Sequence, residues 1–182
     1  RKAIKHAIDG KAFAKAMSKG PFVSVYAGGI ARDSAFFDAD ATSFFPYNPA
    51  GANALLDGLG LMDTDGNGIR NLANGGGDLV INLVQNKDSE NEKLIGDGLA
   101  TMMAEVGIKL NLKPMEDTEP TRQSGEWDWA ISRAQQEFAF PNSGYWSEMG
   151  PVTTSSFDPH MGSDEHPQQF QPFEKEIVSI LE

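Results

Sequence analysis

The sequence contains no cysteine among its 182 residues. Disulfide bonds, thiolate metal sites and cysteine nucleophiles are therefore excluded, although a chain without cysteine fits an exported bacterial protein and a cytosolic one equally well. Basic residues are also scarce, because 15 Lys and Arg stand against 26 Asp and Glu, for a formal charge of −11. This excess of negative charge argues against nucleic acid or an anionic membrane surface as a partner.

Long apolar runs are missing as well, since no stretch approaches the roughly 20 residues of a membrane-spanning helix. The chain begins "RKAIKHAID", without a basic and then apolar leader. Both ends resemble the inside of a helix, so we expect truncation at both ends of the chain. The hydrophobic content of 40% is ordinary for a globular protein, and we expect residues 1–182 to form a single lobe with its own core.

Capping residues predict short helices in the first third of the chain. Residues 1–20 predict either one helix or a broken helix pair, and in the second case Asp9 caps the second helix and Gly20 ends it. The stretch "YNPAGANALLDGLG" predicts another helix, with Asn48 as its N-cap and Gly60 as its stop. The buried stripe of that helix is expected to consist of Leu55, Leu56 and Leu59.

A strand, a helix and a second strand are predicted between residues 78 and 114. "DLVINLV" (78–84) is rich in branched apolar residues, and "IKLNLKP" (108–114) alternates apolar and polar residues. Between them, Ser89 and Glu92 indicate a capping box and Gly107 a terminator. This order favours a right-handed crossover in a parallel sheet. The apolar face of the helix is expected to hold Leu94, Ile95, Leu99, Met102, Met103 and Val106.

Two further elements are indicated nearer the C-terminus. "WDWAIS" (127–132) predicts a third strand, and "QPFEKEIVSILE" predicts the start of another helix. The pair Glu116 and Asp117 follows the second strand and is interpreted as a solvated acidic loop. Together the elements predict an α/β fold.

The stretch "LMDTDGNGIRN" (61–71) resembles part of a calcium loop. Calcium loops of the EF-hand type need a bidentate carboxylate at position 12, and counting from Asp63 that position is Asn74, which is neutral. Asp, Asn and Gly in this order are equally typical of a turn. We therefore favour a turn and expect no metal here, with a calcium-binding structural module as the alternative.

Three histidines are the remaining candidates for catalysis or metal binding. His6 falls in a helix, while His160 and His166 flank "MGSDE" near Asp158 and Asp164. Their spacing matches no helical or zinc-finger pattern. The sequence also lacks the nucleophile elbow and the glycine-rich phosphate loops. A hydrolase therefore remains only the rival hypothesis, and we expect no enzyme and no cofactor.

Aromatic residues gather in two loops. They either line a cleft or pin long loops to the core, and the sequence leaves both interpretations open. Loops that follow the carboxyl ends of strands are where open α/β sheets bind ligands. The rings are Phe36, Phe37, Phe44, Phe45 and Tyr47 in one loop, and Phe138, Phe140, Tyr145 and Trp146 in the other.

The order of these motifs resembles the C-terminal lobe of the peptide/opine/nickel class (family 5) of extracellular solute-binding proteins. "RKAIKHAIDGKAF" is similar to that family's R-x-A-I-x-x-A-I-D-R helix, and "YNPAGANALLDGLGLMDTDGNGIRN" to its Y-x-P helix and following turn. "LVINLV", "LIGDGLATMMAEVGIKLNLKP" and "GEWDWAISR" resemble its next strand, helix and two strands. Loops 21–45 and 134–166 match poorly.

The resemblance implies a type II periplasmic-binding-protein lobe, with a mixed sheet and flanking helices. It further implies the substrate-capture component of an ABC importer, which closes two lobes on a solute and delivers it to a membrane permease. The partners would be the missing N-terminal lobe and that permease, in the periplasm or outside the cell. An oligopeptide is the expected ligand; an opine, a sugar or a metal chelate is the alternative.

The resemblance also implies ligand-binding positions. Dipeptide-binding members carry an arginine in the loop after the first of these strands, where "VQNKDS" offers Lys87, a point charge without the bidentate fork. Members carry Trp and Asp after the last strand, where this chain reads "SRAQQEFAFPN". That departure weakens the case for recognition of an α-amine. The predicted ligand-binding residues are Lys87, Arg133, Gln135, Gln136, Glu137, Phe138, Tyr145 and Trp146.

Overall fold

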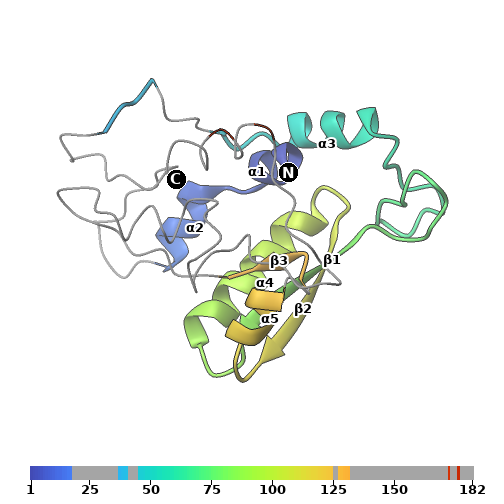
Figure 1. Cartoon of the computed structure of the whole chain (residues 1–182). Coiled ribbons are helices and arrows are strands. Elements are labelled where there is room, and N and C mark those ends of the chain that lie inside the picture. The colour runs from blue at the N-terminus through green and yellow to red at the C-terminus, as the bar shows by residue number, and fades with distance from the viewer. Residues whose placement is uncertain (18–36, 41–44, 125–126, 132–171, 173–175, 177–182) are drawn as a thin grey trace. The chain divides into compact units, whose positions relative to one another are not determined.

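Figure 1 shows a computed structural model of the chain, which describes residues 1–17, 37–40, 45–124, 127–131, 172 and 176. The chain divides into two compact units: Arg1–Ala27 with Ser43–Glu116, and Gly28–Thr42 with Asp117–Glu182. The first unit contains four helices and a pair of strands among its described residues. None of the described helices is both long enough and apolar enough to cross a membrane.

Helices α1 (Lys2–Ala7) and α2 (Gly10–Met17) form a broken pair, which is one of the two predicted alternatives. Ile8 is extended at the break, with φ −92° and ψ 116°. The Asp9 carboxylate then accepts hydrogen bonds from the backbone N–H groups of Lys11 and Ala12, at 3.1 and 2.9 Å. The predicted N-cap is therefore confirmed, whereas Gly20 lies outside the described residues.

Helix α3 (Pro49–Gly58) begins and ends where the sequence predicts. The Asn48 side chain accepts a hydrogen bond from Gly51 N at 2.9 Å, and Gly60 follows the helix with φ +73°. The predicted stripe is wrong in part, because Leu56 is 5% exposed but Leu55 and Leu59 are 42% and 66% exposed. The reason is that α3 packs on α1, and its buried side chains are Ala52 and Leu56, one turn apart.

Strands β1 (Val80–Asn86) and β2 (Lys109–Met115) pair in parallel, in register from Val80 opposite Lys109 to Asn86 opposite Met115. Helix α4 (Glu90–Ala104) connects them and packs against both strands (Figure 1). The predicted strand–helix–strand unit is confirmed, with each strand shifted by one or two residues. Outside this pair, Asn71 and Asp78 form an isolated antiparallel bridge.

The core of the first unit lies between α4 and the strand pair. Its largest side chains that are almost completely buried are Leu83, Met103, Val106 and Ile108. The predicted face of α4 is wrong at Leu94, which is 58% exposed. Five residues separate Leu94 from the buried Leu99, which places it about 140° away around a helix of 3.6 residues per turn.

The predicted capping box at the start of α4 forms only in part. Ser89 Oγ accepts a hydrogen bond from Glu92 N at 3.3 Å, as expected. The Glu92 carboxylate, however, accepts from Asn86 N at 2.6 Å and not from Ser89 N, which donates to Asn86 O at 3.3 Å. The carboxylate thus ties the first turn of α4 to the last residue of β1, because Asn86 N faces the helix start.

Gly96 allows α4 to approach β1 closely, so Gly96→Ala should destabilise the chain. An added Cβ would fall on the Gln85 amide oxygen and lie 3.3 Å from Leu112 Cδ2, and Gln85 is only 5% exposed. We expect a loss of about 1–3 kcal/mol in the free energy of unfolding in urea, although alanine is the better helix former.

Gly58→Ala is the matched control for that substitution, because an added Cβ at this last residue of α3 meets no atom within 4 Å. It should leave the stability unchanged or raise it slightly. Equal effects at Gly58 and Gly96 would contradict the close approach of α4 to β1.

The second unit contains α5 (Glu119–Ser124) and β3 (Trp129–Ala130) among its described residues. The predicted strand at 127–132 is therefore present but shorter than expected. Pro172 and Glu176 are helical, which agrees with the helix predicted for the C-terminal stretch.

Candidate ligand-binding site

The loops that follow β1 and β2 leave the same edge of the strand pair. Because Asn86 lies opposite Met115, the next residues, Lys87 and Glu116, also lie side by side. The backbone N–H of Lys87 donates to Met115 O at 2.7 Å, which extends the pairing by one residue. Carboxyl ends of parallel strands are the usual ligand-binding edge of α/β folds, so this edge is the candidate site.

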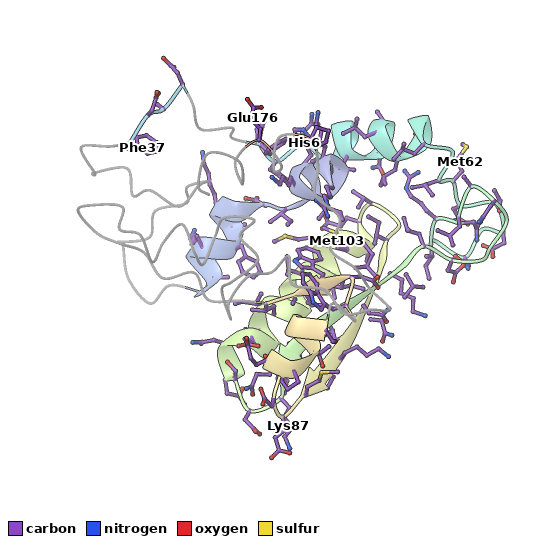
Figure 2. All side chains as sticks on the ribbon, viewed as in Figure 1. His6, Phe37, Met62, Lys87, Met103 and Glu176 are labelled. Atoms are coloured by element: carbon purple, nitrogen blue, oxygen red, sulfur yellow. The ribbon has the colours of Figure 1, made fainter. Side chains whose placement is uncertain are left out.

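Lys87 is the first charged residue after β1, and its charge is positive. Its Nζ lies 3.6 Å from Glu116 Oε2, and the two side chains are 46% and 83% exposed. Figure 2 shows Lys87 at the tip of the loop after β1, pointing away from the core around Met103. Lys87 therefore lies at the candidate edge, and its role in binding stays a prediction.

Acidic residues dominate the start of α4 at the same edge. Glu90 and Glu92 lie in its first turn, and Asp88 precedes its N-cap. The Asp88 N–H donates to Asn86 Oδ1 at 2.8 Å, and the Ser89 side chain accepts from Glu92 N. Negative side chains near a helix N-terminus already offset the positive end of its dipole. This edge therefore offers little attraction to an anion beyond Lys87 itself.

The other predicted ligand-binding residues fall on a part of the chain that the structure does not describe. The same holds for His160 and His166, which carry the hydrolase hypothesis. The predicted ligand-binding residues outside the described residues are Arg133, Gln135, Gln136, Glu137, Phe138, Tyr145 and Trp146.

Two of the predicted loop aromatics act as anchors. The Phe45 ring packs edge-on against His6, with centroids 5.5 Å apart, and Lys5 Nζ lies 4.6 Å from its centroid. The Tyr47 hydroxyl donates to Glu105 Oε2 at 3.2 Å. For these two rings the contacts support the interpretation that loop aromatics pin the chain to helices, and not that they line a cleft.

The calcium-like stretch folds as a hydrogen-bonded turn. Both carboxylate oxygens of Asp63 accept backbone N–H groups, from Gly66 at 2.8 Å and from Gly68 at 2.9 Å. Both glycines have positive φ, +76° and +84°. Within the described residues, no group of three or more potential His, Asp or Glu ligands is placed to hold a metal ion. These bonds give Asp63 the turn-forming role that the sequence favours.

The same hydrogen bonds make Asp63 sensitive to acid. The N–H of Gly68 is the largest cause that lowers the pKa of Asp63 below its usual value, and the N–H of Gly66 adds to it. A pKa that is lower in the folded state contributes stability above the unfolded-state pKa, and this contribution is lost as the pH falls through the folded-state pKa. We expect Asp63→Asn to weaken the decline in unfolding free energy between about pH 5 and pH 3.

Asp97→Asn is the matched control, since Asp97 lies exposed on α4 and its substitution removes the same charge. Urea unfolding at several pH values measures both variants. An identical pH profile for the two variants would refute a specific role for the Asp63 turn.

No sequence motif indicates that Arg70 joins several segments. Its guanidinium donates from Nε to Val106 O at 2.8 Å, from Nη2 to Asn53 Oδ1 at 2.7 Å, and from Nη1 to both Leu61 O and Asp57 Oδ1. The Arg70 side chain is 11% exposed and Asp57 is 53% exposed. Arg70 therefore fastens α3 and the turn to the segment that follows α4, which is a structural role.

A hollow of about 550 Å³ lies beside α1 and α3. Leu55, Leu59 and Ile81 contribute to its aliphatic wall, and Arg1 and Lys2 are its charged lining residues. Among the residues that the structure describes, no aromatic ring and no carboxylate lines this hollow. The described wall of this hollow is therefore mainly apolar, whereas sugar and peptide sites need well-placed polar groups.

The profile of the family described as bacterial extracellular solute-binding proteins, family 5 (middle region), matches residues 1–155. The chain belongs to this family. The resemblance deduced from the sequence motifs is thereby confirmed, and so is the fold: a type II periplasmic-binding-protein lobe that combines a small parallel strand pair with flanking helices.

Among its relatives, this family 5 chain is 32% identical over its full length to the periplasmic alpha-galactoside-binding protein of Rhizobium meliloti (strain 1021). It is 30% identical, with a TM-score of 0.83 over its full length, to the periplasmic binding protein MelB of Agrobacterium fabrum C58, solved with stachyose. The chain spans only 27% and 28% of the lengths of these two proteins.

A more distant match shows how general the fold is. The oligopeptide-binding protein of an ABC transporter from Thermotoga maritima, solved with mannohexaose, has a TM-score of 0.75 at 16% identity. The match covers 97% of this chain and 34% of that protein. At this identity the likeness speaks for the fold alone. The two relatives of 30% and 32% identity are binding proteins, which agrees with the expectation that this chain is not an enzyme.

Proposed function

We propose that this chain is one ligand-binding lobe, the C-terminal one, of a two-lobed capture protein of an ABC importer, and that its ligand is a neutral oligosaccharide of the α-galactoside class. The observation that carries this proposal is the identity of 30–32% over the whole chain to an α-galactoside-binding protein and to a protein solved with stachyose. It supports a sugar, first considered as an alternative, over the expected oligopeptide.

The charges at the candidate site support a neutral ligand. Lys87 is the only basic residue in segment 85–92, and it already faces Glu116 at 3.6 Å. The same segment carries Asp88, Glu90 and Glu92. A peptide would bring a terminal carboxylate, and the acidic side chains of this segment would repel that carboxylate. A hydroxyl-rich sugar brings no charge and avoids this penalty.

An oligopeptide is the second candidate, because Lys87 projects from the edge where a peptide carboxylate would be held. In either case, closure takes free energy from contacts on both lobes at once. The other partners proposed are the N-terminal lobe and the membrane permease. The periplasm or the outer cell surface is the proposed location, by analogy with the periplasmic relatives.

Calorimetric titration of the two-lobed protein that carries this chain tests the proposal. We expect stachyose or a shorter α-galactoside to bind with a dissociation constant at or below the micromolar range and to raise the melting temperature. The same chain expressed alone should bind these sugars far more weakly.

A pool of oligopeptides is the competing ligand in that titration. Stabilisation by peptides without any response to α-galactosides would overturn the sugar and favour the second candidate. Equal affinity of the two-lobed protein and of this chain alone would contradict binding by closure.

A further inference from the structure

The backbone holds Lys87 and Glu116 side by side. The parallel register places Asn86 opposite Met115, and Lys87 N donates to Met115 O at 2.7 Å. The Asn86 side chain also donates to Glu116 O at 3.4 Å. The two side chains therefore meet because of strand pairing, and a substitution of either one should leave the geometry of the edge intact.

The ion pair contributes little to folding stability. Its 3.6 Å separation and the exposure of both side chains, 46% and 83%, are typical of pairs that water and salt screen strongly. Both charged groups remain accessible to a solute that approaches the edge. The pair is consequently better placed to act on a ligand than on the fold.

We propose that Glu116 is a specificity-determining residue. It forms an ion pair with Lys87 and so disfavours ligands that carry a carboxylate. An anionic group that approaches Lys87 must displace the Glu116 carboxylate and then stay close to it. Asp88, Glu90 and Glu92 add to the negative potential along the same loop and helix start. The affinity for a neutral sugar does not depend on these charges.

This inference rests on the proposed function, because it requires that the edge faces the bound solute. It adds a mechanism of selection: the ion pair discriminates by repelling the wrong ligand and not by gripping the right one. Glu116 is more than the solvated loop residue that the sequence indicates. The positions of Lys87 and Glu116 indicate their pairing, because each follows directly after the last residue of one of the two paired strands.

Glu116→Gln in the two-lobed protein is the direct test. The ligands are stachyose and an oligosaccharide of the same length that ends in a uronic acid. At low ionic strength we expect the affinity for the acidic sugar to rise about fivefold, and the affinity for stachyose to change less than about twofold. The gain should shrink at high salt, because the charges are exposed.

Glu90→Gln is the matched control, because it removes the same charge from the first turn of α4 without removing the partner of Lys87. A second control combines Glu116→Gln with Lys87→Gln, which should abolish the gain. An equal gain from Glu90→Gln would overturn the specific pairing in favour of a general field. A gain that survives the double substitution would overturn it too.

The wild-type titrations separate this inference from the proposed function. If peptides bind and stachyose does not, the proposed sugar fails, but Glu116→Gln should still raise the affinity for a peptide carboxylate. No change in that affinity would overturn the inference. A wild type that binds the acidic sugar as tightly as stachyose would overturn it as well.

Discussion

Leu83→Ala is expected to lower the free energy of unfolding by about 3–5 kcal/mol. Leu83 lies in the middle of β1, has no exposed surface, and belongs to the core between the strand pair and α4. Truncation removes apolar contacts and leaves a cavity, because neighbours held in a strand pair and a long helix relax only partly. Urea unfolding followed by circular dichroism measures the loss.

Leu94→Ala is the matched control, since it makes the same chemical change on the same structural unit. Leu94 is 58% exposed on α4, so its truncation should change the stability by less than about 0.5 kcal/mol. A similar loss at both positions would contradict the orientation of α4 on the strand pair.

Arg70→Ala is expected to cost about 3 kcal/mol. The side chain is 11% exposed and donates to the carbonyl groups of Val106 and Leu61 and to the side chains of Asn53 and Asp57. Alanine leaves these acceptors without their donor, and part-buried acceptors that lose a charged donor are costly. Thermal and urea unfolding both measure this effect.

Two further substitutions separate the effect of the several N–H donors of the Arg70 guanidinium from the effect of its charge. Arg70→Lys retains the charge but cannot donate in several directions at once, so we expect it to lose more than half as much stability as Arg70→Ala. Asp57→Asn removes the ion pair but leaves the bonds to Val106, Leu61 and Asn53. Because Asp57 is 53% exposed, this change should cost less than about 1 kcal/mol. A larger loss at Asp57 than at Arg70 would refute the central role of the guanidinium.

Local signals predicted most of the described fold. Asp9, Asn48 and Ser89 each cap a helix within three residues of their own position, so the sequence around them is sufficient. The alternation of apolar residues and the glycine after α4 likewise predicted the crossover between β1 and β2. Strand ends shifted by one or two residues, because pairing and not composition decides where a strand stops.

The errors arose where a distant partner decides the outcome. Leu55 and Leu59 share a helix with the buried Leu56, but only the direction in which α1 packs decides which of them is covered. The hydrogen-bond partners of Arg70 range from Asn53 to Val106 along the chain, and no periodic pattern in the sequence predicts these contacts. At the candidate site, the family resemblance located Lys87, whereas its neighbour Glu116 became apparent only from the strand register.

The crossover β1–α4–β2 has a kinetic consequence. Its two strands, the connecting helix and the buried side chains Leu83 and Met103 all lie between Val80 and Met115. Short loops cost little entropy to close, and local contacts form quickly. We therefore expect this segment to begin folding as soon as Met115 has left the ribosome, because it needs no residue that is synthesised later. It would then serve as an early template for helices α1 and α2, which are synthesised before it and contact α4.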